Sequence, residues 1–201
     1  LGTTTSHDLT FDTANTERMR ITSSGQVGIG TDSPRVTASV IGLTIGNSTT
    51  GGSELVLREN TGNDWRIFNN GYLGFIDDNT ERMRIDSSGN LLVGKTATGT
   101  GTVGAELRAN GFNAFVRDGG EVMNINRLSS DGTIIDFRKD SSTVGSIGTE
   151  GGRLQIGKGA SGLYFYDSGP SVLPWNIGSN SIADNSIDLG SSGSRFKDLY
   201  L

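Results

Sequence analysis

The sequence lacks cysteine altogether and has three prolines and a single histidine among its 201 residues. Without cysteine there is no disulfide framework and no thiolate metal site, and the redox compartment is left open. The lone histidine, His7, has no second histidine with which to form a catalytic or metal-binding pair, so we assign it no role. No apolar run approaches the length of about 18 residues that indicates a membrane-spanning helix, and we expect no membrane insertion.

A concentrated basic surface is also missing. The formal net charge is −5, and the arginines alternate with acidic residues instead of clustering. Proteins that bind nucleic acid carry a basic patch or stripe, so we expect no nucleic-acid partner. The glycine-rich stretch 98–104 lacks the lysine and the strand-to-helix setting of a phosphate-binding loop. No cofactor is therefore expected.

Helical periodicity is absent too. No segment of ten residues places apolar side chains at helical spacing, whereas strand-like runs of four to seven residues fill most of the chain. Thirty-one glycines and a hydrophobic share of 33% describe a turn-rich chain with a limited apolar supply. The sequence predicts an all-β protein.

One passage occurs nearly twice. The run NTERMRITSSGQVGIG at 15–30 returns as NTERMRIDSSGNLLVG at 79–94, with eleven of sixteen positions identical and a spacing of 64 residues. A motif kept at such a distance indicates a chain built from tandem units. We therefore expect an elongated protein made of repeated short strands and hairpins.

Each copy of the repeat has the pattern of a strand followed by a turn. Apolar and polar residues alternate in it, so Met19 and Ile21 are predicted on one face of a strand, and Met83 and Ile85 on the same face of the second copy. The arginines between them are predicted on the other face, where they either form ion pairs that fix register or make a solvated edge that resists aggregation. The Ser-Ser-Gly triplet that follows predicts a turn.

A shorter pattern recurs along the chain: an apolar residue, any residue, an aliphatic residue and glycine. Both apolar side chains then share one face of a strand, and the glycine permits a turn or a close approach of backbone. The pattern predicts a repeated strand ending. It begins at Val27, Leu43, Leu91, Leu154, Trp175 and Ile187.

The limited apolar supply raises an energetic question. Ordering one residue costs roughly 1–2 kcal/mol of backbone entropy, while full burial of a large aliphatic side chain contributes about 1.5–3 kcal/mol. Strands with two or three apolar residues each do not easily close a core alone. A solenoid and an intertwined homotrimer both solve the problem. Because no fixed short rung repeats, we favour the homotrimer, a β-fibre of β-helix or β-prism type, with Met19, Ile21, Met83 and Ile85 packed along its axis.

The repeats suggest a division of the chain into four parts. The first repeat ends at Pro34, whose fixed φ and missing N–H suit a strand exit. The chain begins with leucine inside a repeat, so we expect it to be a segment of a longer polypeptide. The predicted parts are 1–34, a first β-repeat; 35–98, a second; 99–160, a diverged unit; and 161–201, a terminal β-segment that leads to a distal domain outside this chain.

Three passages carry a resemblance to a known class of proteins. The runs NTERMRI followed by SSGQVGIGTDSP, then INRLSSDGTIIDFRKDSSTVGSIG, and the closing NSIDLGSSGSRFKDLYL are similar to the shaft repeats of bacteriophage tail fibres and tail spikes. The resemblance covers about half of the chain. It implies a homotrimer on the virion, exposed to the external medium, with other tail proteins at one end and a host surface glycan at the other. The function it implies is that of a stiff spacer involved in host attachment.

Two other functions fit parts of the sequence. A tail-spike glycosidase or lyase would need a pair of carboxylates about 5–10 Å apart, and the acidic residues available are better explained as turn, capping and surface residues. A bacterial surface adhesin with similar repeats is the second alternative. We expect no enzymatic activity. The acids considered are Asp64, Asp77, Asp78, Asp118, Glu121 and Asp136.

One cluster has the residue types that bind sugars. Sugar rings stack on aromatic faces while carboxylate, amide and guanidinium groups take the hydroxyls, and both kinds of contact must converge on one concave patch. Asp64, Trp65, Arg66 and Tyr72 supply these types and are the candidate glycan contacts. For Trp65, packing along the trimer or under a turn is the stronger expectation, and for Trp175 core packing is expected more strongly still.

Overall fold

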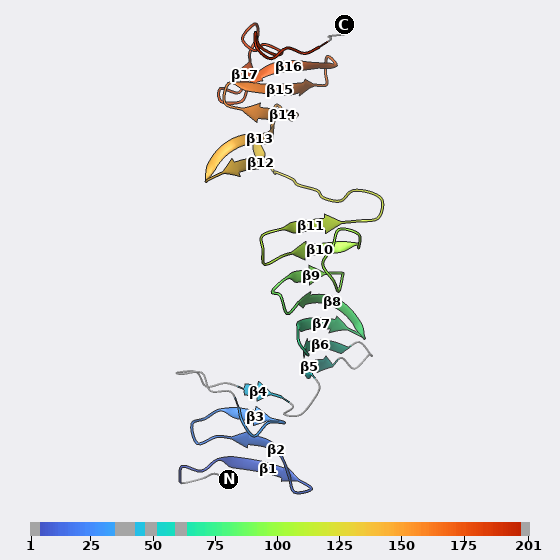
Figure 1. Ribbon diagram of the computed structural model, residues 1–201, viewed down its shortest axis with the longest axis vertical. Coiled ribbons are helices and arrows are strands. Elements are labelled where there is room, and N and C mark those ends of the chain that lie inside the picture. The colour runs from blue at the N-terminus through green and yellow to red at the C-terminus, as the bar shows by residue number, and fades with distance from the viewer. Residues whose placement is uncertain (1–4, 35–42, 47–51, 59–63, 198–201) are drawn as a thin grey trace. The chain divides into compact units, whose positions relative to one another are not determined.

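The computed structural model describes residues 5–34, 43–46, 52–58 and 64–197. These residues form no helix, and their strands make three sheets, none of which closes on itself (Figure 1). The predicted all-β class is confirmed.

The first compact unit, Leu1–Met123, holds two of the sheets. Strands that are neighbours in space are also neighbours in sequence. All of them pair antiparallel except the third and fourth, which are parallel. The four-stranded sheet consists of β1 (Leu9–Thr13), β2 (Thr16–Ile21), β3 (Val27–Ile29) and β4 (Leu43–Ile45). The seven-stranded sheet consists of β5 (Ser53–Arg58), β6 (Asp64–Asn69), β7 (Leu73–Asp77), β8 (Thr80–Ile85), β9 (Leu91–Val93), β10 (Gly104–Leu107) and β11 (Asn113–Val116).

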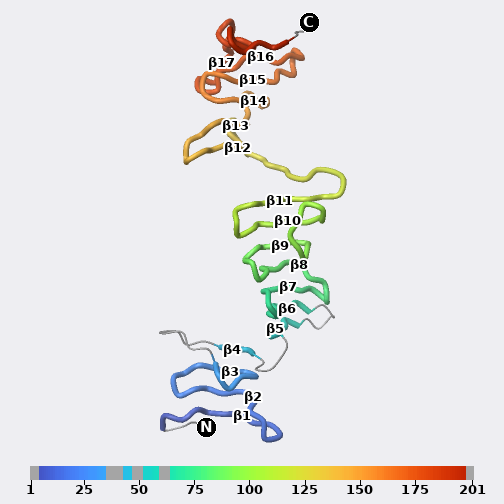
Figure 2. The backbone as a smooth tube through the Cα atoms, viewed as in Figure 1, coloured from blue at the N-terminus to red at the C-terminus, as the bar shows by residue number. Residues whose placement is uncertain are grey.

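The second compact unit, Asn124–Leu201, holds one antiparallel sheet of six strands. Its strands also follow one another in sequence order, and short turns join most of them (Figure 2). They are β12 (Gly132–Lys139), β13 (Ser142–Glu150), β14 (Arg153–Lys158), β15 (Ser161–Tyr166), β16 (Ser171–Asn176) and β17 (Ser181–Ile182).

The predicted part boundaries differ from the sheet boundaries. The boundary at 98 falls between β9 and β10 of the seven-stranded sheet, and the boundary at 160 falls between β14 and β15 of the six-stranded sheet. The repeat motif alone does not indicate where a sheet ends.

The tandem repeat of the sequence is also a repeat of the backbone. Hairpins β1–β2 and β7–β8 turn at Ala14–Asn15 and Asp78–Asn79, and both residues of each turn have positive φ, as in type I′ hairpin turns. In each hairpin the register shifts beside a phenylalanine, Phe11 or Phe75, which marks a β-bulge.

The hairpin β12–β13 is a third copy of this design. Its turn residues Asp140 and Ser141 also have positive φ, and its register shifts after Phe137. This copy was not predicted, because it shares little with the first two besides Phe137 and Ile147, which are ten residues apart as Phe75 and Ile85 are.

The Ser-Ser-Gly turns form as predicted. Gly25 and Gly89 have φ values of 88° and 80°, a region that glycine enters without steric cost. The shorter strand-ending pattern holds at β3, β4 and β9, each of which stops one residue before the glycine. At Leu154 the strand β14 continues past the glycine to Lys158, and the glycine instead permits a close approach of backbone, because a Cβ atom at Gly157 would lie 2.5 Å from Gly162 Cα. At Trp175 the strand β16 ends at Asn176, two residues before the glycine, and at Ile187 the pattern is wrong because that residue lies in no strand.

Candidate interaction surfaces

One face of the seven-stranded sheet is apolar over its whole width. Phe75 lies opposite Met83, and Met83 lies opposite Val93 on its other side. Because every second residue of a strand points to the same face, the cross-strand pairs extend this row through all seven strands. The face consists of Leu55, Leu57, Trp65, Ile67, Leu73, Phe75, Met83, Ile85, Leu91, Val93, Ala105, Leu107 and Phe115.

This apolar face is uncovered in the isolated chain. Leu57 is 58% exposed, Trp65 48% and Phe115 49%. Soluble monomers rarely expose contiguous apolar patches of more than a few hundred Å², and larger ones mark interaction sites. The face is therefore a candidate surface for association with another protein.

The four-stranded sheet has an apolar face of the same kind. Met19 pairs with Phe11 and Ile29, and Ile21 pairs with Leu9 and Val27. Each strand again contributes two apolar side chains. The face consists of Leu9, Phe11, Met19, Ile21, Val27, Ile29, Leu43 and Ile45.

The six-stranded sheet has a comparable face. Ile135, Ile147 and Ile156 lie side by side across its first three strands, and the row continues through the next two. Among its members, Val172 is 55% exposed and Leu163 is 49% exposed. The face consists of Ile135, Phe137, Ile147, Leu154, Ile156, Leu163, Phe165, Val172 and Pro174.

Within this sheet a small core lies on the opposite face. Trp175 stacks on Tyr164 with ring centroids 4.3 Å apart, and both residues are buried. The Tyr164 hydroxyl donates to the carbonyl of Glu150 at 2.9 Å. A Cβ atom at Gly162 would lie 2.8 Å from Ile177, so glycine is needed for this packing. The predicted core position of Trp175 is confirmed.

The four residues predicted to pack along a trimer axis lie on these apolar faces. Met19 and Ile21 are on the apolar face of the four-stranded sheet, and Met83 and Ile85 hold the same positions in the seven-stranded sheet. Their orientation is thus the same in both copies. Their place on a trimer axis stays a prediction.

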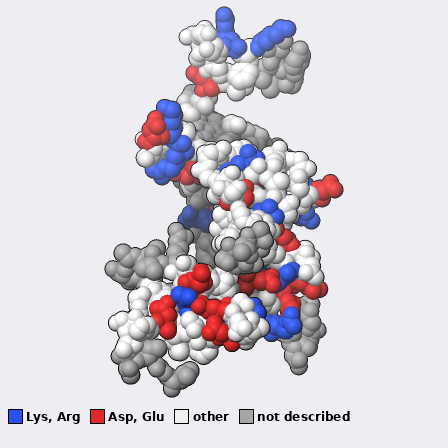
Figure 3. Space-filling view, turned by 60° about the horizontal axis from the view of Figure 1, so that its bottom comes forward, with Lys and Arg blue, Asp and Glu red and all other residues white. Residues whose placement is uncertain are grey.

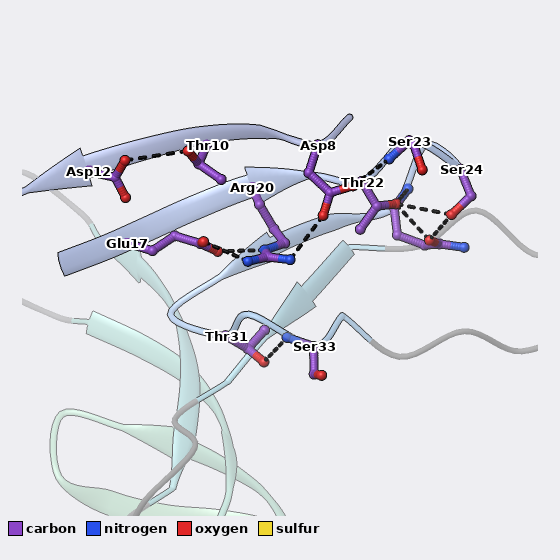
Figure 4. A network of polar contacts seen from close by, with 11 residues as sticks. Asp8, Thr10, Asp12, Glu17, Arg20, Thr22, Ser23, Ser24, Thr31 and Ser33 are labelled. Carbon is purple, nitrogen blue, oxygen red and sulfur yellow. Dashed lines mark hydrogen bonds and ion pairs between the residues drawn. The ribbon is translucent and has the colours of Figure 1, made fainter. Parts of the chain in front are cut away.

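The opposite face of the four-stranded sheet carries a network of ion pairs. The Arg20 guanidinium donates to both carboxylate oxygens of Glu17, at 2.5 and 2.6 Å, and to Asp8 at 2.9 Å (Figure 4). Asp8 also accepts a hydrogen bond from the Ser23 amide, which ties the start of the chain to the turn. This arginine is held within its own chain.

Arg84, the equivalent of Arg20 in the second copy, is held in a similar way. It donates to both carboxylate oxygens of Glu81, and it lies 4.0 Å from the ring centroid of Tyr72. Tyr72 occupies the position in the second copy that is equivalent to Asp8 in the first. The hydrogen bond from Arg84 lowers the pKa of Glu81. Acidic and basic side chains lie next to one another at several places on the visible surface (Figure 3).

A buried ion pair that the sequence analysis did not find joins β10 to the loop before it. The side chains of Lys95 and Glu106 are both 0% exposed, with Nζ and Oε2 3.0 Å apart. Glu106 also accepts hydrogen bonds from the Gly99 amide at 2.9 Å and from Arg108 at 2.6 Å. Lys95 donates to the carbonyl of Gly99 at 2.5 Å. Glu106 therefore has partners on several sides, as a buried charge requires.

This pair predicts a pH dependence of stability. Burial raises the pKa of Glu106, but the hydrogen bonds from Gly99, Lys95 and Arg108 outweigh it and lower that pKa to about 2. A depressed carboxyl pKa stabilises the folded state above the unfolded-state pKa, and this contribution is lost as the pH falls towards the folded-state pKa. We expect the free energy of unfolding to fall between about pH 4.5 and 2. The Glu106→Gln variant should lose less of its stability over this range in denaturant titrations. An identical fall in both proteins would contradict this role.

The candidate glycan contacts do not converge on one surface. Asp64 and Arg66 line a hollow of about 180 Å³ with Glu54 and Asp78, whereas Trp65 points to the apolar face because it lies between them in the strand. Tyr72 lies against Arg84. The apolar face around Trp65 favours packing over sugar stacking.

Three of the six acids considered for hydrolysis form local ion pairs. Asp64 pairs with Arg58, Asp77 with Arg82 and Asp136 with Arg138. Over the described part of the chain, no three His, Cys, Asp or Glu side chains gather as metal ligands. The same residues include no helix long and apolar enough to cross a membrane.

Comparison of the chain with protein-family models, with curated proteins and with solved structures gave no match.

Proposed function

We propose that this chain is a structural segment of a trimeric phage tail fibre. It serves as a stiff spacer in host attachment, located on the virion and exposed to the medium. Its partners are two further copies of itself and other tail proteins. The observation that carries the proposal is the uncovered apolar face on each of the three sheets, such as the one around Met83 and Ile85.

The width of these faces supports three copies. Most strands contribute two apolar residues to their face, for example Leu163 and Phe165 in β15, so the apolar stripe is only about 7 Å wide at 3.3 Å per residue. Three such stripes can enclose a triangular interior whose sides are near the roughly 10 Å spacing of packed sheets. No sheet closes on itself, so a single sheet does not bury its own apolar face. In this proposal the apolar faces are buried by other copies of the chain. The phage assignment comes from the resemblance of the repeats.

The oligomeric mass in solution tests the proposal. We expect a single species with about three times the chain mass of 21.1 kDa in light scattering or sedimentation equilibrium. A folded, monodisperse monomer would contradict it. A stable dimer would keep self-association but reject the trimer.

Glycan contact is a secondary part of this proposal. Within it, Asp64, Arg66 and Tyr72 are the candidate contacts, and Trp65 packs in the shared interior. We propose no enzymatic activity, so incubation of the assembled protein with host envelope polysaccharide should leave the length of the polysaccharide unchanged. Shortened polysaccharide would favour the tail-spike hydrolase or lyase instead. Whole-cell binding without any virion association would favour the adhesin.

A further inference from the structure

The connector between β11 and β12, residues 117–131, contains a partial match to the strand motif of β2 and β8. Glu121–Ile125 reads Glu-Val-Met-Asn-Ile, which keeps the glutamate, methionine and isoleucine of Glu17–Ile21 and Glu81–Ile85. A serine-containing turn follows it at 129–132, as in the other copies. The sequence of this stretch therefore favours a strand.

In the connector, however, the motif forms no strand. Residues 117–131 are all exposed, and within the described residues no backbone-to-backbone hydrogen bond involves them. They run as a loop from β11 to β12 (Figure 2). Met123 is 50% exposed, Ile125 47% and Leu128 77%. The two other copies form β2 and β8, which pair with a strand on each side. The same pattern is thus paired twice and unpaired once.

An unpaired stretch of this kind is suited to strand addition. Its apolar residues Met123 and Ile125 alternate with Asn124 and Asn126, which is the period of a half-buried strand. Exposed N–H and C=O groups on an extended backbone pair readily with an open sheet edge. Such edges exist on both sides of the connector, because β11 ends the seven-stranded sheet and β12 begins the six-stranded sheet.

We propose that residues 121–128 form a β-strand only in the assembled protein, by adding to an open sheet edge of a second copy of this chain. Met123 and Ile125 then extend the apolar face of that sheet, as Met83 and Ile85 do in β8. The inference rests on the proposed self-association. It identifies the segment through which one copy of the chain pairs with another. A second copy is the partner because the motif has no backbone pairing among the described residues of its own chain, and exchange of an identical element between protomers is a low-cost route to assembly.

Amide hydrogen exchange on the full chain tests the inference, with the oligomeric mass measured on the same sample. We expect amides of 121–128 to exchange on the order of 100-fold more slowly than an unstructured peptide, comparable with those of β8. Free exchange at 121–128 in a trimer whose β8 is protected would overturn the inference and leave the proposed function standing. A monomeric mass would overturn both.

Two variants separate the faces of the strand. Ile125→Asp should increase amide exchange at 121–128, because it places a charge on the apolar side, while the neighbouring Asn124→Asp should leave that exchange unchanged. Equal effects of the two would overturn the proposed orientation. In a chain kept monomeric by Ile85→Asp, exchange at 121–128 should be free. Protection in that monomer would reveal a partner in the same chain and overturn the inference.

Discussion

Replacement of Ile85 by aspartate is expected to abolish the trimer while leaving the single-chain sheet folded. Ile85 is 40% exposed on the apolar face of the isolated chain, so an aspartate there is solvated in the monomer. In the proposed trimer the same position would lie in the shared interior, where three carboxylates would be buried without partners. Burial of an unpaired ion costs several kcal/mol, and this cost arises three times.

The matched control is Arg82→Ala in the same strand. The Arg82 side chain is 55% exposed and pairs with Asp77, and an exposed pair of this kind contributes about 0–1 kcal/mol. Arg84 is a poorer control because its loss leaves the half-buried Glu81 without its main partner. Light scattering should find monomer for Ile85→Asp and trimer for Arg82→Ala. Equal loss of trimer in both would refute the assignment of faces.

The alternation of the repeat predicts the two faces of the sheets. Met19, Ile21, Met83 and Ile85 lie together on apolar faces because strands have a period of two and the hairpin turns fix the register. The third hairpin, β12–β13, was not predicted because it resembles the other two in geometry more than in sequence. It shares with them a β-bulge beside a phenylalanine, here Phe137, and two turn residues with positive φ.

The sequence was less informative about polar groups. Asp64, Trp65 and Arg66 are consecutive, which suggested one binding cluster, but consecutive residues of a strand point to opposite faces. Lys95 and Glu106 are separated by a loop, and nothing in their local sequence indicates that the loop buries both charges. In the strand-ending pattern at Leu91, Leu92 occupies the position where any residue is allowed. It is nevertheless completely buried, with 0% of its surface exposed. Burial at such positions depends on loops that cover the sheet, which periodicity does not reveal.

The two copies of the repeat therefore have different requirements at one shared position. Gly28 of β3 and Leu92 of β9 are equivalent, and each lies opposite the arginine of its copy. A Cβ atom at position 28 would lie 2.8 Å from the Thr31 carbonyl oxygen and 2.9 Å from Pro34. In the second copy the same place is filled by a leucine side chain.

Exchange of these residues should destabilise both sheets, although each change only copies one repeat into the other. Leu92→Gly removes a fully buried side chain, at a cost of at least the ~2–5 kcal/mol of a buried leucine truncation. Gly28→Leu forces side-chain atoms onto the backbone at Thr31, and overpacking costs about 1–3 kcal/mol or more. The control is the reciprocal pair Ile29→Val and Val93→Ile, one position further on the half-exposed apolar faces, where the expected change is about 0.5–1.5 kcal/mol or less. Guanidinium-induced unfolding followed by circular dichroism measures all four. If Gly28→Leu and Leu92→Gly were as mild as the control pair, the loops of the two copies would cover their sheets alike, and the difference described at this position would be wrong.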